Sequence, residues 1–343
     1  MQQLPRRMWG RRTVVLGALA ALAATPCGAA RAADAQYTLR VSSWGSPTAP
    51  QVSVFVPTFT KLVEQGSKGR IAVQAFPAGA LVKEQDVPSA IQSRVVDISL
   101  STIGAWASVS PPAALINSVM FRPTQANFES SVCSGSTLFK ALDESLQKRD
   151  VRLLAVLDNG PPMVASRAAM TTPNAFRGKA VRVYDKASAE VIHTLGGAPS
   201  TMPVSDVYPA LQRGTVQAAI GGLQGIAGLK EYEVAKYLLD GNGAWGVGVT
   251  VYVMNGAALT ALPPDLQQVV LKAGKEAETV TNKAIFAFFD KARETLRAHG
   301  MQLTILQPDT PEYAAFTKAL EPLVKAQKSR LPASLLQQVA DGH

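Results

Sequence analysis

The sequence is poor in the residues that build disulfides and metal sites. Its 343 residues include two cysteines and three histidines. Cys27 lies close to the N-terminus, within a segment with the features of a leader, so the mature chain keeps Cys133 alone and forms no intramolecular disulfide. No CxxC or HExxH spacing occurs. We therefore expect no zinc site, no other metal and no cofactor.

Aromatic residues are few, and most of the excess of positive charge lies at the N-terminus. Phe, Trp and Tyr make up 6% of the chain, which leaves little surface for stacking nucleic-acid bases. The formal net charge is +9, but residues 1–32 hold five arginines and no acid. Without that segment, 29 basic residues face 25 acidic ones. We expect no nucleic-acid partner.

Residues 1–32 have the layout of a cleavable signal peptide. Arginines precede the apolar run at 13–30, and Ala30-Arg31-Ala32 places small residues around a cleavage point. We predict cleavage near residue 32 and export to the periplasm. Arg11-Arg12 loosely matches a twin-arginine signal, so the Sec and twin-arginine routes both stay open. No later apolar run reaches the roughly 20 residues of a membrane span.

Strand and helix patterns alternate along the rest of the chain. In the first half, strands are predicted at 37–43, 70–76 and 95–101, with helices at 55–65 and 84–93. In the second, strands are predicted at 151–157, 180–184, 218–221 and 247–254, with helices at 187–195 and 205–213. This order predicts two α/β units, the first with a largely parallel sheet.

A long helix is predicted after the second unit. Pro263-Pro264-Asp265 suits a first helical turn, and Gly300 ends the apolar periodicity. About 35 residues at about 1.5 Å each give a length of roughly 50 Å. Because this exceeds the expected width of either unit, we predict that the helix spans both.

The sequence contains no motif that pairs a nucleophile with a base, as an exported hydrolase requires. There is no G-x-S-x-G sequence, and no histidine is placed in sequence to activate Cys133. His193 falls in a predicted helix, and Lys230-Glu231-Tyr232-Glu233 is typical of a solvated helix face. We expect no enzymatic activity.

A ligand-binding site requires fewer specifically placed residues than a hydrolase site, and Arg182 is the strongest candidate for it. Arg182 lies inside the apolar strand Ala180-Val181-Arg182-Val183-Tyr184, where an unpaired guanidinium is costly. Its planar fork suits a carboxylate, although an edge strand facing water would also explain it. Trp44 follows the first strand at the edge where open α/β sheets bind ligands. Trp245 lies in a glycine-rich loop, and Gly221-Gly222 form either a turn or a close approach to a ligand.

Several stretches in order resemble the DctP-type solute-binding proteins of TRAP (tripartite ATP-independent periplasmic) transporters. The resemblance runs from about residue 37 to residue 336. The matching stretches are Gly69-Arg70-Ile71, Phe76-Pro77-Ala78-Gly79-Ala80-Leu81, Val96-Asp97-Ile98, Phe176-Arg177-Gly178-Lys179-Ala180-Val181-Arg182-Val183, Val207-Tyr208-Pro209-Ala210-Leu211-Gln212, Tyr232-Glu233-Val234-Ala235-Lys236-Tyr237 and Leu262-Pro263-Pro264-Asp265-Leu266-Gln267.

The resemblance implies a periplasmic-binding-protein-like α/β fold. Two α/β lobes would be joined by hinge strands, with the long helix spanning both. We expect lobe I at 36–159 plus 248–287, and lobe II at 160–247 plus 288–340. A monomer would close over an organic acid and deliver it to the membrane permease subunits of the transporter. A binding protein for a sensor or another transporter stays open as an alternative, and an exported hydrolase is the weakest one.

The resemblance also implies a set of ligand-binding residues. Arg182 would clamp the ligand carboxylate. Around it the resemblance places Trp44, Gln85, Thr102, Val204, Gly221 and Gly222, and the glycine-rich loop adds Trp245 as a candidate. Two departures bear on the ligand: Pro162 stands where many members carry a second arginine, and Gly221 where many carry asparagine. One charge fewer and more room favour a bulky or aromatic monocarboxylate over a dicarboxylate.

Overall fold

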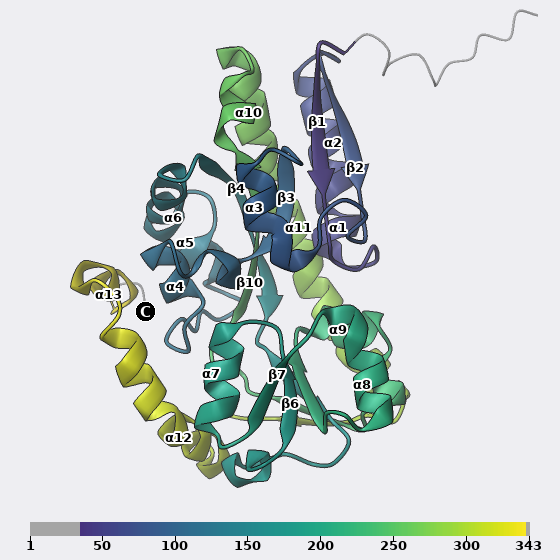
Figure 1. Ribbon diagram of the computed structural model, residues 1–343, viewed down its shortest axis with the longest axis vertical. Coiled ribbons are helices and arrows are strands. Elements are labelled where there is room, and N and C mark those ends of the chain that lie inside the picture. Colours follow the sequence, from purple (N-terminus) through teal and green to yellow (C-terminus); the bar gives the residue numbers. More distant parts are fainter. Residues whose placement is uncertain (1–34, 341–343) are drawn as a thin grey trace, which may run out of the picture.

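The chain folds into two α/β lobes, one above the other in Figure 1. The computed structural model describes residues 35–340, so the predicted signal peptide at 1–32 lies outside the described residues. Within residues 35–340, no helix has both the length and the apolar character needed to cross a membrane. The same residues contain no group of three or more His, Cys, Asp and Glu side chains placed to hold a metal ion.

Lobe I is built on a five-stranded sheet with the order β2-β1-β3-β10-β4. Its strands are β1 (Tyr37–Ser42), β2 (Ile71–Phe76), β3 (Ile98–Thr102), β4 (Val151–Gly160) and β10 (Gly248–Asn255). Its helices are α1 (Pro50–Ser53), α2 (Phe55–Gly66), α3 (Val87–Gln92), α4 (Pro111–Ile116), α5 (Phe128–Val132), α6 (Thr137–Gln147) and α10 (Gly256–Thr260). The 3₁₀ turns η1 (Glu84–Asp86) and η2 (Ile103–Trp106) connect them.

Lobe II is built on a six-stranded sheet with the order β11-β9-β5-β8-β6-β7. Its strands are β5 (Met163–Ser166), β6 (Ala180–Val183), β7 (Ala198–Thr201), β8 (Ala218–Gly221), β9 (Tyr237–Asp240) and β11 (Gln302–Ile305). Its helices are α7 (Lys186–Thr194), α8 (Val207–Arg213), α9 (Leu223–Gly228) and α12 (Pro311–Lys328). Short 3₁₀ turns are η3 (Pro173–Phe176), η4 (Val204–Asp206) and η5 (Glu231–Glu233).

The sheet of lobe I is mixed, which corrects the prediction of a largely parallel sheet. β1 pairs in parallel with β2 and β3, whereas β10 pairs antiparallel with β3 and β4. The reason is the path of the chain between the lobes. β4 runs toward lobe II and continues into β5, and β10 returns from β9 beside it, so the two crossing strands run in opposite directions.

The long helix α11 (Pro264–Ala298) confirms the prediction in type and length, with 35 residues. Its buried side chains recur every three or four positions, from Leu266 to Leu296. It runs from lobe I into lobe II in Figure 1. At Gly274 it approaches β4 so closely that an added Cβ would lie 2.7 Å from the carbonyl oxygen of Leu154. A glycine is therefore required at this crossing.

Polar side chains of α11 fix it to β4 next to the crossing between the lobes. Glu278 accepts the backbone N–H groups of Val156 at 2.6 Å and Ser134 at 2.9 Å. Asn282 accepts the N–H of Asp158 at 2.9 Å and donates to the carbonyl of Val156 at 3.0 Å. These bonds satisfy backbone groups that would otherwise be buried without a partner. These bonds therefore join α11 and β4 where the chain passes between the lobes.

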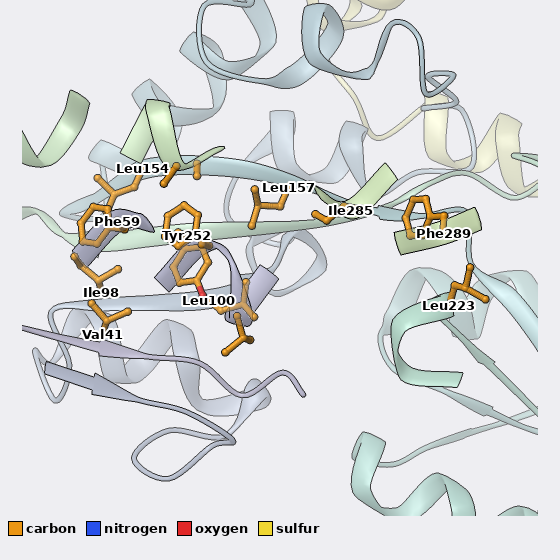
Figure 2. Close-up of a cluster of buried hydrophobic side chains, with 14 of the residues drawn as sticks. Val41, Phe59, Ile98, Leu100, Leu154, Leu157, Leu223, Tyr252, Ile285 and Phe289 are labelled. Atoms are coloured by element: carbon orange, nitrogen blue, oxygen red, sulfur yellow. The ribbon is translucent and has the colours of Figure 1, made fainter. Parts of the chain in front are cut away.

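One hydrophobic cluster continues from lobe I along α11 into lobe II. Figure 2 shows it running from Val41 and Ile98 past Tyr252 to Ile285 and Phe289. In lobe I, the rings of Tyr252 and Phe55 stack with centroids 3.7 Å apart. The Tyr252 hydroxyl donates to the backbone carbonyl of Gln51 at 2.9 Å. The core thus holds the segment after β1 in place beside the space between the lobes.

The C-terminal helix departs from the predicted division into lobes. Residues 288–340 are predicted in lobe II, and α12 does pack there, on the cluster that contains Phe316 and Leu320. α13 (Ala333–Ala340) follows α12, and Leu331, Leu335 and Leu336 pack against the lobe I cluster that holds α4, α5 and α6. The chain end therefore crosses back to lobe I, as Figure 1 shows.

Candidate functional site

A cavity of about 380 Å³ lies between the lobes. Lobe I contributes the loop after β1, the end of β3 and the start of β10, and lobe II contributes β6, β8, α9 and the turns η4 and η5. Its charged lining residues are Glu84, Arg182 and Glu231. The polar ones include Trp44, Ser46, Gln51, Thr102, Asn117, Asn159, Tyr184, Ser205, Gln224 and Thr250, and the apolar ones include Pro47, Val52, Leu100, Val204, Leu229 and Val249.

Arg182 projects from β6, an interior strand of the lobe II sheet, and is 4% exposed. Its Nε and Nη2 donate to the carbonyl of Met202 at 3.1 and 3.0 Å, and its Nη1 donates to the carbonyl of Ile220 at 3.1 Å. These bonds use three of the five guanidinium N–H groups. One N–H on each terminal nitrogen is left for the cavity that the residue lines.

No carboxylate pairs with Arg182 within ion-pair distance in residues 35–340. Burial lowers the pKa of Arg182, and the nearby Glu231 and Glu84 partly oppose that shift. A buried, charged fork that is held from behind by two carbonyls suits a bidentate pair with an anion. The arrangement can therefore bind a carboxylate end-on, with no rearrangement of the guanidinium.

Several buried polar atoms of the lining have no hydrogen-bond partner among the described residues. They are the Trp44 Nε1, the Gln51 Oε1, both amide atoms of Gln224 and the Thr250 hydroxyl. Buried polar groups normally find partners, because leaving one unpaired costs about 1–3 kcal/mol. These donors and acceptors surround the cavity from both lobes and can bond to the body of a ligand.

The structure brings six of the eight predicted site residues to this cavity. Trp44 and Thr102 line it from lobe I, and Arg182, Val204, Gly221 and Gly222 line it from lobe II. Gln85 is exposed and does not line it; its neighbour Glu84 does. The segment begins with the 3₁₀ turn η1 rather than with an α-helix, which changes the side chain that faces inward.

Trp245 belongs to the core of lobe II and not to the cavity lining. It is 5% exposed, its Nε1 donates to the carbonyl of Pro162 at 2.6 Å, and its ring packs edge-on against Phe316 at 5.3 Å. Its place in a glycine-rich loop has a packing reason, because a Cβ on Gly241 would lie 2.4 Å from the indole. The indole stabilises the loop between β9 and β10.

Glu231 was interpreted from the sequence as part of a solvated face, and the structure corrects this. The side chain is 3% exposed and lines the cavity, whereas Glu233 on the same turn is exposed and bonds to the Tyr208 hydroxyl at 2.8 Å. Burial raises the pKa of Glu231 to about 7, and burial likewise raises the pKa of Glu84 to about 7. The positive charge of Arg182 lowers the pKa of both and so limits the rise.

The remaining nucleophile candidate, Cys133, has the surroundings of a structural residue. Its thiol is buried, donates to the carbonyl of Val156 at 3.4 Å and contacts the Asn282 amide nitrogen at 3.3 Å. Burial raises the pKa of this thiol far above its usual value, which suppresses the reactive thiolate. The cysteine packs between β4 and α11 beside the hinge.

Two α/β lobes that are joined by crossing strands and a spanning helix, with a cavity between them, form the architecture of a two-lobed ligand-binding protein. The family model for bacterial extracellular solute-binding protein family 7, DctP, matches residues 41–330. The chain belongs to this family.

Curated relatives and solved structures agree with that assignment. A solute-binding protein of Sulfitobacter sp. (strain NAS-14.1) is 29% identical over 64% of this chain and 66% of its own length. The C4-dicarboxylate-binding periplasmic protein DctP of Rhodobacter capsulatus is 23% identical over 82% of this chain and 84% of its own. A TRAP periplasmic solute-binding protein of Roseobacter denitrificans with bound β-D-glucuronate has a TM-score of 0.80 at 20% identity, covering 88% of this chain and 98% of that one.

Proposed function

We propose that this protein is the extracytoplasmic receptor of a TRAP transporter, and that it binds an organic acid between its lobes. The observation that carries the proposal is the free end of the Arg182 guanidinium in the interlobe cavity. The signal-like residues 1–32 support a periplasmic location. After closure, the receptor would deliver the acid to the permease subunits in the membrane.

Closure would bend the β4–β5 connection, the β9–β10 connection and α11, while the α12–α13 segment also passes between the lobes. In the open state the acid reaches Arg182 on lobe II. Rotation of lobe I then brings Trp44 and Thr102 over the ligand. Removing water strengthens the pair between Arg182 and the carboxylate, because the local dielectric constant falls.

We propose further that the ligand is a bulky monocarboxylate. Arg182 is the sole cationic residue of the described lining, and Pro162, at the position where many family members carry a second arginine, does not line the cavity. A second ligand carboxylate would share the cavity with Glu84 and Glu231, which is unfavourable. Trp44, Leu100 and Leu229 provide contact surface for an apolar or aromatic body.

A thermal-shift screen of residues 33–343 tests the receptor function. The panel holds dicarboxylates, 2-oxo acids, sugar acids, aromatic monoacids and amino acids, each against the amide of its carboxyl group. A ligand at 100 times its dissociation constant stabilises the protein by about 2.7 kcal/mol, which is several degrees. We expect a shift from acids and none from amides. A panel in which no acid shifts the transition, with a protein shown by mass spectrometry to be ligand-free, would refute the proposal.

A further inference from the structure

The cavity contains more acidic than basic side chains. Glu84 reaches it from η1 of lobe I, and Glu231 from η5 of lobe II. Neither side chain forms a hydrogen bond or ion pair within residues 35–340. Arg182 has no ion-pair partner there either, because it donates to the Met202 and Ile220 carbonyls instead. All three charges therefore lack a direct partner of opposite charge.

The two carboxyls lie near Arg182 from different lobes. The charge of Arg182 lowers the pKa of each, while Asp185 raises that of Glu84. Asp185 itself is engaged elsewhere: it caps α7 through Ser188 and accepts from the Asn117 amide at 2.8 Å. Tyr184 also lines the cavity. The cavity thus holds, beside Arg182, the buried carboxyl of Glu231 and the half-buried carboxyl of Glu84, and both are free to pair with a ligand.

The charges of the lining do not balance when a simple anion binds. With both glutamates ionised, the three charged lining residues sum to one negative charge. A bound monocarboxylate would raise that to two, and closure of the lobes would then shield these charges from water. Buried charges are normally paired, since an uncompensated one is strongly destabilising. A plain acid can bind only with proton uptake by the glutamates, whereas a ligand that carries its own cation needs none.

Building on the proposed function, we propose that the ligand is a zwitterion. Its carboxylate binds the free N–H groups of Arg182, and a cationic nitrogen, such as an ammonium or a substituted amine, pairs with Glu231 and with Glu84 of the opposing lobe. Because these glutamates come from different lobes, the cation also links the lobes in the closed state. Glu231 and Glu84 are then specificity-determining residues for the ligand class.

Matched pairs of acids test the zwitterion directly. We would measure by calorimetry, at pH 7.5, the affinity of the protein for each acid of two pairs. The first pair is phenylalanine and 3-phenylpropionate, and the second is 5-aminopentanoate and pentanoate. Each pair differs by one ammonium group. We expect the amino acid of at least one pair to bind about tenfold or more tightly than its plain partner, because it gains one charge-assisted pair. The same titrations in two buffers of different ionisation enthalpy should show proton uptake with the plain acid alone.

Isosteric variants assign the effect to the two glutamates. Glu231→Gln and Glu84→Gln should remove the preference for the amino acid and strengthen binding of the plain acid. Glu233→Gln is the matched control, since Glu233 lies on the same turn but is exposed and outside the cavity. Thermal unfolding of each variant verifies that it folds.

The outcomes separate this inference from the receptor function. Plain acids that bind as tightly as their amino partners, or more tightly, without proton uptake would overturn the zwitterion and leave the receptor function standing. A preference for the amino acid that persists in both glutamine variants would overturn the roles of Glu231 and Glu84. If no acid of either kind binds, the proposed function fails, and this inference fails with it.

Discussion

Replacing Arg182 with methionine should remove carboxylate binding while leaving the lobes folded. Methionine keeps an unbranched apolar stem but no charge and no donor. Two N–H groups of Arg182 remain free for a ligand, because the other three donate to the Met202 and Ile220 carbonyls. A charge-assisted hydrogen bond contributes about 1.5 kcal/mol or more, so losing two costs about 3 kcal/mol. That corresponds to at least a hundredfold weaker binding.

In Arg182→Met, the free energy of unfolding should change less than the free energy of ligand binding. Arg182→Met loses hydrogen bonds to two carbonyls, but it also removes a buried charge that has no ion-pair partner in the described residues. Calorimetry of the best-binding acid and thermal unfolding measure the two effects separately.

Arg182→Lys, which keeps the charge without the planar fork, should bind with intermediate affinity. Arg213→Met, an exposed arginine of lobe II, is the control. A folded Arg182→Met that binds the acid as tightly as the unaltered protein would refute this role for Arg182.

Three further predictions concern fluorescence, the hinge and pH. Trp44 lines the cavity and Trp245 does not, so Trp44→Phe should abolish the ligand-induced change in tryptophan fluorescence, and Trp245→Phe should keep it. Gly160 has φ +70° and an added Cβ would lie 2.9 Å from the Phe289 ring, so Gly160→Ala should lower the unfolding free energy by at least about 1 kcal/mol in urea titrations. Burial raises the pKa of Glu231 from 4.5 to about 7, so the folded protein binds a proton that the unfolded chain has released between those values. Glu231 alone should lower the unfolding free energy by roughly 3 kcal/mol at most as pH rises through that window, and burial also raises the pKa of Glu84, Asp158 and Glu278 to about 7. Glu231→Gln should make the total fall shallower; an equally steep fall in the variant would contradict the role of Glu231.

The elements with a strong local pattern were predictable from the sequence. α11 is the clearest case, since its apolar period, its opening prolines and the closing Gly300 are all local signals. The direction of β10 could not be predicted from the sequence. It depends on the chain returning from lobe II, and no residue within the strand indicates this path. The crossing of α13 back to lobe I was missed for the same reason.

A residue of the candidate site could be predicted where a charged side chain stands within an otherwise apolar strand. Arg182 stood out because the residues around it are apolar, and the structure places it in the cavity. Glu231 gave no such signal: its neighbours Lys230 and Glu233 are charged, and only tertiary packing distinguishes the buried glutamate from the exposed one. Gln51 and Gln224 could not be predicted from the sequence either. Whether a side-chain amide has a hydrogen-bond partner depends on the residues that the fold places around it.

The most direct test of acid binding between the lobes is a crystal structure with the acid that gives the largest thermal shift. We expect the acid between the lobes, with its two carboxylate oxygens within hydrogen-bond distance of the Nη1 and Nη2 atoms of Arg182. Trp44 should cover the ligand body from lobe I. An acid that binds outside this cavity, or that lies in it with its carboxylate away from Arg182, would contradict the role of Arg182 as the carboxylate-binding residue.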